Sequence, residues 1–241
     1  MSGMTPAQQV AVLIPAAYVV GSIPFGLMVG KMKGVDPRTA GSGNIGASNV
    51  GRLLGKKFFA LVFLLDLLKG LLPMLVAGHV LHAAGHDAKV YLLWLLVGFA
   101  AILGHMFSAF LGFKGGKGVA TSSGVILGLV PYFTIPGVVA LIVWTIVLKG
   151  SRYISVASIA AAVSFPIVYV LIALVLGWPV FGEQLPLLGF SVLVAAMIVY
   201  KHRSNLARLR AGAEPRYDQR AAGDGGNPDV ARAPAEAPGP V

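Results

Sequence analysis

Long apolar runs alternate with short polar segments along this chain. Five of the runs come close to the roughly 20 residues that a transmembrane helix needs. They cover residues 7–30, 58–79, 90–112, 154–177 and 186–200. Because a helix satisfies its own backbone hydrogen bonds in lipid, this pattern predicts an all-α protein, a polytopic bundle of membrane helices.

The stretch 119–148 is also apolar, but Pro131 and Pro136 interrupt it. It is long for one span and short for two. A double crossing keeps Lys149, Arg152 and the basic C-terminal segment on the same side as the earlier basic loops, as the positive-inside rule requires. We therefore expect seven transmembrane helices, with the N-terminus outside and the C-terminus cytoplasmic. A re-entrant hairpin with five full spans would have the same parity.

The composition agrees with a membrane protein and excludes some chemistry. Charged residues make up 12% of the chain and hydrophobic residues 56%, whereas a soluble domain has about 25% charged residues. Cysteine is absent, which excludes disulfides, thiolate metal sites and a cysteine nucleophile. The net charge is +10, but the placement of the basic residues, more than their sum, sets orientation in the membrane. We expect no nucleic-acid partner. Residues 1–210 form the expected transmembrane domain, and residues 211–241 a disordered cytoplasmic tail.

Three polar segments share the cytoplasmic side in this topology. They are AGSGNIGASNVGR (40–52), FKGGKGVATSSG (113–124) and KHRSNLARLRAGAE (201–214). Glycine-rich turns can present backbone N–H groups to an anion, and Lys and Arg add the charge that a phosphate needs. Each segment alone could be a tight turn among lipid headgroups. Together they predict a site for more than one phosphate.

Polar residues near or inside the spans leave alternatives open. His202 and Asn205 share one helix face, where they could serve the site or simply meet anionic lipid. Asp66 and Lys69 lie in the second span, either as substrate contacts or as a buried pair that fixes packing. His105 could bond to the second polar segment or be an ordinary interfacial histidine.

Several familiar motifs fail on their context. The G-x-G-x-x-G spacing in residues 40–52 follows no strand, so dinucleotide binding is rejected. GFKGGKGV lacks the spacing and the Ser or Thr of a phosphate-binding P-loop, which argues against NTP hydrolysis. His82 and Asp87 match an acyltransferase H-x-x-x-x-D pattern but fall on the outer loop. No G-x-S-x-G elbow offers a serine nucleophile.

Four segments resemble signatures of the bacterial membrane glycerol-3-phosphate acyltransferases that use acyl phosphate. They are GSIPFG, GSGNIGASNVGR, GHMFSAFLGFKGGKGVATS and HRSNLARLRAGAE, and the resemblance extends over about residues 10–214. It implies a multi-pass enzyme of the bacterial plasma (inner) membrane. The enzyme would transfer an acyl group from acyl phosphate to the 1-hydroxyl of glycerol 3-phosphate. The products would be lysophosphatidic acid and phosphate, in the first step of phospholipid synthesis.

The resemblance also implies which residues form the site. Catalytic roles are expected for Ser42, Lys117 and His202. Substrate binding is expected from Gly41, Gly43, Asn44, Arg52, Gly115, Gly116 and Asn205. No covalent acyl-enzyme is needed, because acyl phosphate is already activated, and no metal or cofactor is expected. The alcohol proton could pass to His202 or to a substrate phosphate.

A transporter of small phosphorylated solutes is the alternative from another functional class. The placement of all three polar segments at one face argues against it, as does the lack of an internal repeat. The sequence leaves the oligomeric state and the acyl-chain preference open.

Overall fold

The computed structural model describes residues 3–217, and this part of the chain is helical with connecting loops. Of the expected disordered tail, residues 211–217 are described and residues 218–241 lie outside the described part. The helices are α1 (Pro6–Ser22), α2 (Phe25–Met32), α3 (Ala47–Leu54), α4 (Lys56–Leu81), α5 (Ala88–Met106), α6 (Val119–Gly128), α7 (Thr134–Ser151), α8 (Ile154–Val175), α9 (Leu185–Lys201) and α10 (Arg203–Arg210). Two single 3₁₀ turns, His82–Ala84 and Ala109–Leu111, follow α4 and α5.

Membrane-length helices match most of the predicted spans. In the described residues, five segments are long and apolar enough to cross a bilayer: Pro6–Met32, Lys56–Leu81, Ala88–Leu111, Thr134–Ser151 and Ile154–Val175. A sixth joins them if α9 and α10 count as one span across their 49° bend. The all-α membrane bundle is therefore confirmed with five or six candidate spans. The count of seven and the orientation stay predictions.

The stretch 119–148 divides into two helices of unequal length. The short apolar helix α6 begins at Val119 and ends at Gly128, and α7 begins at Thr134. Pro131 lies between them, where a helix would lose a hydrogen bond at its ring. The first predicted span is likewise broken, because Ile23 and Pro24 separate α1 from α2.

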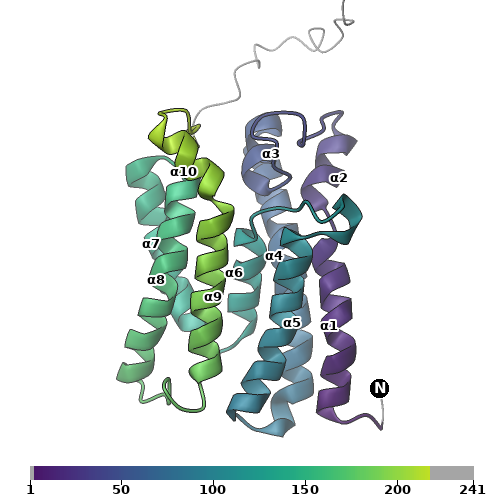
Figure 1. The fold of residues 1–241 in the computed structure, drawn as a ribbon, viewed down its shortest axis with the longest axis vertical. Coiled ribbons are helices and arrows are strands. Elements are labelled where there is room, and N and C mark those ends of the chain that lie inside the picture. The colour runs from purple at the N-terminus through teal and green to yellow at the C-terminus, as the bar shows by residue number, and fades with distance from the viewer. Residues whose placement is uncertain (1–2, 218–241) are drawn as a thin grey trace, which may run out of the picture.

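The helices run side by side along the long axis of the molecule (Figure 1). α1, α4, α5 and α6 form one group, and α7, α8 and α9 form the other (Figure 1). The short helices α2, α3 and α10 lie at the upper end of this view, opposite the N-terminus (Figure 1). All three polar segments are therefore at one end of the bundle.

Glycines let helices within the first group approach closely. A Cβ on Gly21 of α1 would collide with the backbone of Ala101 of α5, and one on Gly124 of α6 would collide with the backbone of Leu67 of α4. Small residues at helix contacts are typical of membrane bundles, where close packing replaces the hydrophobic effect.

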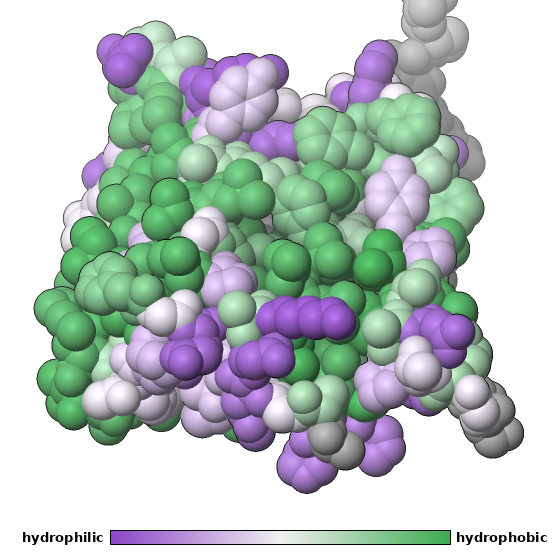
Figure 2. Space-filling view, turned by 60° about the horizontal axis from the view of Figure 1, so that its bottom comes forward, coloured by the Kyte–Doolittle hydropathy of each residue, from purple (hydrophilic) through white to green (hydrophobic). Residues whose placement is uncertain are grey.

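The exterior fits a lipid environment. Figure 2 shows a broad hydrophobic zone across the molecule, bordered by hydrophilic residues. Large apolar side chains such as Leu171 and Leu174 of α8 are more than half exposed. At the other end of the bundle from the polar segments, Asp87 caps α5 by accepting a hydrogen bond of 2.9 Å from the Val90 amide. This structural role accounts for the aspartate of the rejected H-x-x-x-x-D pattern.

Candidate active site

One cavity collects residues from all three polar segments. From the sequence-predicted set it is lined by Ser42, Asn44, Arg52, Lys117, His202 and Asn205. Glu214, Asp66 and His105 also line it. The structure therefore brings six of the ten predicted site residues together in space.

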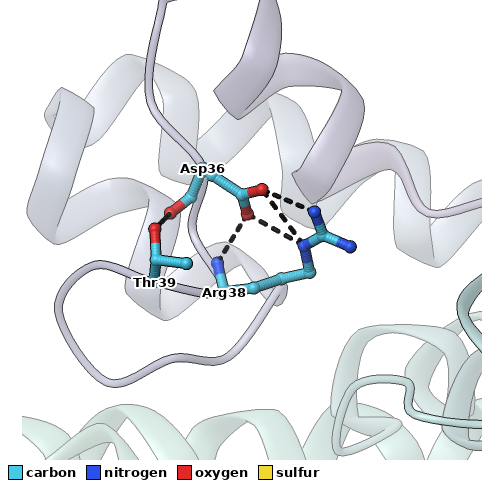
Figure 3. A network of polar contacts seen from close by, with 3 residues as sticks. All are labelled: Asp36, Arg38 and Thr39. Atoms are coloured by element: carbon cyan, nitrogen blue, oxygen red, sulfur yellow. Dashed lines mark hydrogen bonds and ion pairs between the residues drawn. The ribbon is translucent and has the colours of Figure 1, made fainter.

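The loop between α2 and α3 begins with a closed polar turn (Figure 3). The Asp36 carboxylate accepts hydrogen bonds from the Arg38 amide (2.9 Å) and from its guanidinium (2.6 Å at Nη2). The Thr39 hydroxyl donates to the Asp36 carbonyl at 3.2 Å. The bonds from Arg38 lower the pKa of Asp36 to about 2, so its carboxylate stays ionised throughout the physiological pH range.

Asn49 holds the next part of the same loop. Its buried side-chain amide donates to the carbonyls of Pro37 (2.9 Å) and Ala40 (3.0 Å). Its Oδ1 accepts from the Ser42 amide at 2.8 Å. Gly41 lies against this side chain with φ of +61°, a conformation that favours glycine. Asn49 thus places Ser42 at the cavity, a role that the sequence did not reveal.

The glycines of this loop shape it and do not line the cavity. Gly43 has φ of +69°, and its amide already donates to the Ala40 carbonyl at 3.1 Å. Neither Gly41 nor Gly43 is among the lining residues. The Gly43 amide is therefore engaged within the loop, and substrate binding by Gly41 and Gly43 stays a prediction.

The glycines of the second polar segment are similarly engaged. The Gly115 amide donates to the Met106 carbonyl at 3.2 Å, and the Gly116 amide to the His105 carbonyl at 3.0 Å. A Cβ on Gly116 would collide with the His105 imidazole. These glycines allow the loop to lie against the end of α5, and their bonded amides are not available as anion donors.

Three helix N-termini also border the cavity. α3 begins at Ala47, α6 at Val119 and α8 at Ile154, and all three residues line the cavity. The first N–H groups of a helix have no intrahelical partner and carry a partial positive charge. Three such ends around one cavity make a setting that suits anions.

Two cations add full charges to this setting. Arg52 is half-buried, and its Nε has no hydrogen-bond partner among the described residues. Burial lowers the pKa of Arg52, but a guanidinium stays protonated. The ammonium of Lys117 donates to Oδ1 of Asn205. Burial lowers the pKa of Lys117 to about 8, and the charges of nearby arginines act in the same direction.

His202 follows the end of α9 and is 3% exposed. Its Nδ1 lies 2.8 Å from the Ile198 carbonyl. A carbonyl only accepts, so the proton sits on Nδ1 and Nε2 keeps its lone pair. Burial lowers the pKa of His202 to about 4. The imidazole is therefore neutral at pH 7 and can accept one hydrogen bond.

Glu214 is a site residue that the sequence reasoning missed. Its buried carboxylate accepts hydrogen bonds from Ser155 (2.7 Å), from the Asn205 amide (2.6 Å) and from Arg208 (2.9 Å). Burial alone would raise the pKa of Glu214, but these bonds and the Arg208 charge lower it. The carboxylate fixes the orientation of Asn205, whose Oδ1 then receives Lys117. Glu214 is the only acidic residue between residues 184 and 217. Its isolation in a basic segment is the sequence feature that could have identified it.

Asp66 of α4 and His105 of α5 also line the cavity. Asp66 forms a 2.8 Å ion pair with Lys69, and all three side chains are buried. Lys69 also donates to the Ile23 carbonyl at 2.9 Å, where the chain breaks between α1 and α2. Nδ1 of His105 is 3.6 Å from Asp66. The pair thus serves packing through Lys69, while Asp66 contributes to the cavity wall.

An apolar slot adjoins this polar cavity. The slot has a volume of about 310 Å³ and is lined by residues of α4, α5, α6, α7, α8 and α9. Five residues line both spaces: Phe59, Phe63, Val119, Trp144 and Ser158. A molecule with an anionic head and an alkyl chain would therefore fit across the two. Within the described residues, no group of three or more His, Asp or Glu side chains is placed to hold a metal ion.

Sequence comparison finds close relatives over most of the chain. A family model described as glycerol-3-phosphate acyltransferase matches residues 11–212. The glycerol-3-phosphate acyltransferase of Aquifex aeolicus is 43% identical over 207 residues, which cover 85% of this chain and 97% of the relative. That of Geobacter metallireducens is 46% identical over 206 residues, covering 85% and 96%.

Solved structures give the same answer. The crystal structure of PlsY, an integral membrane glycerol 3-phosphate acyltransferase, in its glycerol 3-phosphate form shares 42% identity and a TM-score of 0.73, covering 86% of this chain and 95% of that one. The lysophosphatidic acid form of PlsY matches over the same shares of the two chains, with 41% identity and a TM-score of 0.71. The chain belongs to the glycerol-3-phosphate acyltransferase family.

Proposed function

We propose that this protein transfers a fatty acyl group from acyl phosphate to the 1-hydroxyl of glycerol 3-phosphate, in the inner membrane of a bacterium. Lysophosphatidic acid and inorganic phosphate are the products. The observation that carries the proposal is the joining of a cationic cavity to an apolar slot. Membership of an acyltransferase family removes the support for a solute transporter.

The proposed topology has seven crossings, an outer N-terminus and a cytoplasmic site. The basic residues support it, because Lys33 and Arg38 belong to the loop between α2 and α3, two helices that lie at the end of the bundle opposite the N-terminus (Figure 1). In this topology α6 and α7 together make the double crossing. Residues 1–210 form the acyltransferase domain, and residues 211–241 follow as a cytoplasmic tail.

Charge neutralisation is the main task of the polar cavity in this proposal. Both substrates carry a phosphate, and two anions repel each other unless cations lie between them. Arg52, Lys117 and the three helix N-termini supply that positive charge. Ser42, Asn44 and Asn205 offer polar side chains that orient the substrates, and the apolar slot takes the acyl chain. Holding the reactants in line then lowers the barrier further.

The reaction forms one C–O bond and breaks another. The 1-hydroxyl oxygen of glycerol 3-phosphate attacks the acyl carbonyl carbon, and the bond from that carbon to the phosphate oxygen breaks. The phosphate leaves with the electron pair. His202 accepts the hydrogen bond of the attacking hydroxyl at Nε2 and so orients it. Its pKa of about 4 makes it a poor final proton acceptor, whereas a phosphate with a second pKa of about 6 is a better one. We therefore assign the proton to a substrate phosphate.

A donor comparison tests the proposed function. The purified protein in lipid nanodiscs receives glycerol 3-phosphate with palmitoyl phosphate, palmitoyl-CoA or palmitoyl-acyl carrier protein. We expect lysophosphatidic acid, detected by mass spectrometry, with palmitoyl phosphate alone. Absence of product with every donor would contradict the activity, and product from palmitoyl-CoA alone would contradict the donor assignment.

A further inference from the structure

Phe165 and Phe190 are the residues of α8 and α9 in the slot lining that lie farthest along their helices from the polar cavity. We propose that the floor of this slot, formed by Phe165 of α8 and Phe190 of α9, sets the longest acyl chain that the enzyme accepts. The inference rests on the proposed function, because it assigns the slot to the acyl chain of the donor.

The slot is a built space within a close-packed bundle. Protein interiors normally leave few voids larger than a water molecule. Here three neighbouring helices each present two small residues to the same space: Gly137 and Ala140 from α7, Ala161 and Ala162 from α8, and Ser191 and Ala195 from α9. A leucine at any of these positions would occupy part of the slot, so the small side chains keep it open.

The floor is firmly backed. Phe165 and Phe190 are 4% and 8% exposed. Behind them the fully buried Phe133 meets Phe165 edge-to-face at 5.1 Å and stacks on Phe190 at 6.2 Å between ring centroids. Phe133 also packs on Tyr169, whose hydroxyl donates to Gln184 at 2.8 Å. A chain that reaches the floor therefore meets an ordered aromatic cluster that has no room to yield.

The depth of the slot suits one ordinary acyl chain. Phe190 lies about 18 Å along the helix axis from His202, at the usual rise of about 1.5 Å per residue. The hydrocarbon core of a bilayer is about 30 Å thick and contains two leaflets, so one chain spans about 15 Å. The distance from the reacting end to the floor thus matches the length of a membrane lipid chain.

The slot also has an exposed side. Leu141 of α7 lines it and is 59% exposed, so a chain can enter from the membrane there. If the chain instead leaves sideways at this point, it does not reach Phe165 or Phe190. The two arrangements differ in one measurable property, the dependence of activity on chain length.

Two kinds of variant, expected to shift the acyl-chain length of the product in opposite directions, test the role of Phe165 and Phe190. The enzyme receives glycerol 3-phosphate and an equimolar mixture of saturated acyl phosphates from lauroyl to arachidoyl, and the products are quantified by mass spectrometry. Phe165→Ala and Phe190→Ala should shift the product distribution to longer chains. Because the chain moves from lipid and not from water, packing contacts set the gain, and the products longer than palmitoyl should rise at least about twofold in relative share. Ala162→Leu, which narrows the slot above Phe165, should shift the distribution to shorter chains.

Matched controls separate specificity from damage to the fold. Leu171→Ala lies on the exposed side of α8 and should keep the wild-type distribution. Ala160→Leu repeats the Ala162 substitution at a position outside the slot lining. Because the readout is a ratio within one mixture, a lower folded fraction leaves it unchanged. Phe165→Leu provides a milder version if Phe165→Ala does not accumulate.

The outcomes distinguish this inference from the proposed function. Opposite shifts in the two kinds of variant support the floor. The same product distribution in the wild type and all slot variants overturns it, and indicates a chain that leaves sideways. Absence of product from the wild type with any acyl phosphate would instead contradict the proposed function.

Discussion

Replacement of Lys117 by methionine is a direct probe of the charge in the polar cavity. Methionine keeps a long apolar stem of similar shape while removing the ammonium. Asn205 loses one partner but stays bonded to Glu214 at 2.6 Å, so the site should keep its shape. The substitution therefore isolates the electrostatic contribution of one cation to the reaction of two anions.

The expected loss follows from the position of this ammonium. At about 4 Å and an effective dielectric constant near 20, a charge pair is worth about 4 kcal/mol. Lys117 is half-buried, so solvent screening reduces this value, and about 3 kcal/mol corresponds to a loss near 10²-fold in kcat/KM.

Steady-state kinetics with palmitoyl phosphate and glycerol 3-phosphate measure this loss. The matched control is Lys114→Met, because Lys114 is an exposed lysine on the same loop outside the cavity lining. The control should keep its activity within about twofold, as surface substitutions usually do. If Lys117→Met loses less than about tenfold, or if both variants lose equally, Lys117 does not stabilise the reacting charges.

Three further predictions concern pH and neighbouring residues. The KM for glycerol 3-phosphate should rise as the pH increases through about 8, because the free enzyme loses the Lys117 charge above its pKa. Lys117→Arg should abolish this rise in KM. If the rise persists in that variant, Lys117 is not the group that titrates. His202→Ala should lower kcat about 10²-fold without moving the limbs of the pH–rate profile, because neutral His202 orients the 1-hydroxyl of glycerol 3-phosphate. Disappearance of an acidic limb would show that His202 is the titrating base. Glu214→Ala should destabilise the protein by about 3 kcal/mol, because three donors lose their buried acceptor, and should raise both KM values; an unchanged thermal unfolding midpoint in detergent would contradict this role.

The membrane helices could be predicted from sequence because their signal is local. Length and hydropathy alone located the predicted span 58–79, which corresponds to α4, Lys56–Leu81. The break at Ile23 and Pro24 was missed, since the apolar run continues through it without a change in composition. At this break the Ile23 carbonyl accepts a hydrogen bond from Lys69 of α4. This contact joins two helices, so the sequence around Ile23 gives no sign of it.

The side chains of the cavity could be anticipated, but the state of the backbone amides could not. Segments rich in Ser, Asn, Arg and Lys stand out in an apolar chain, so Arg52 and Lys117 were identifiable. Whether an amide is free depends on which carbonyl approaches it in the fold. Gly116 bonds to the His105 carbonyl, and the sequence contains no local sign of that contact.

Residues that position other residues also could not be recognised from one segment of the sequence at a time. Asn49 acts on Pro37, Ala40 and Ser42, and Glu214 links α8 to α10 through Ser155 and Asn205. Both carry side chains that are ordinary for a surface loop, and only their burial reveals the role.

Arg52 is the residue through which binding of the glycerol 3-phosphate in this cavity can be measured without the acyl-transfer step. Its half-buried guanidinium has an Nε without a partner among the described residues, and so it is poised for an anion. The measurement is equilibrium binding of radiolabelled glycerol 3-phosphate to purified wild-type protein and to Arg52→Ala, in nanodiscs without a donor. We expect saturable binding to the wild type and at least about a 10²-fold weaker affinity in the variant, because a charged partner of the phosphate is lost. Equal affinity in the two proteins would contradict this role of Arg52.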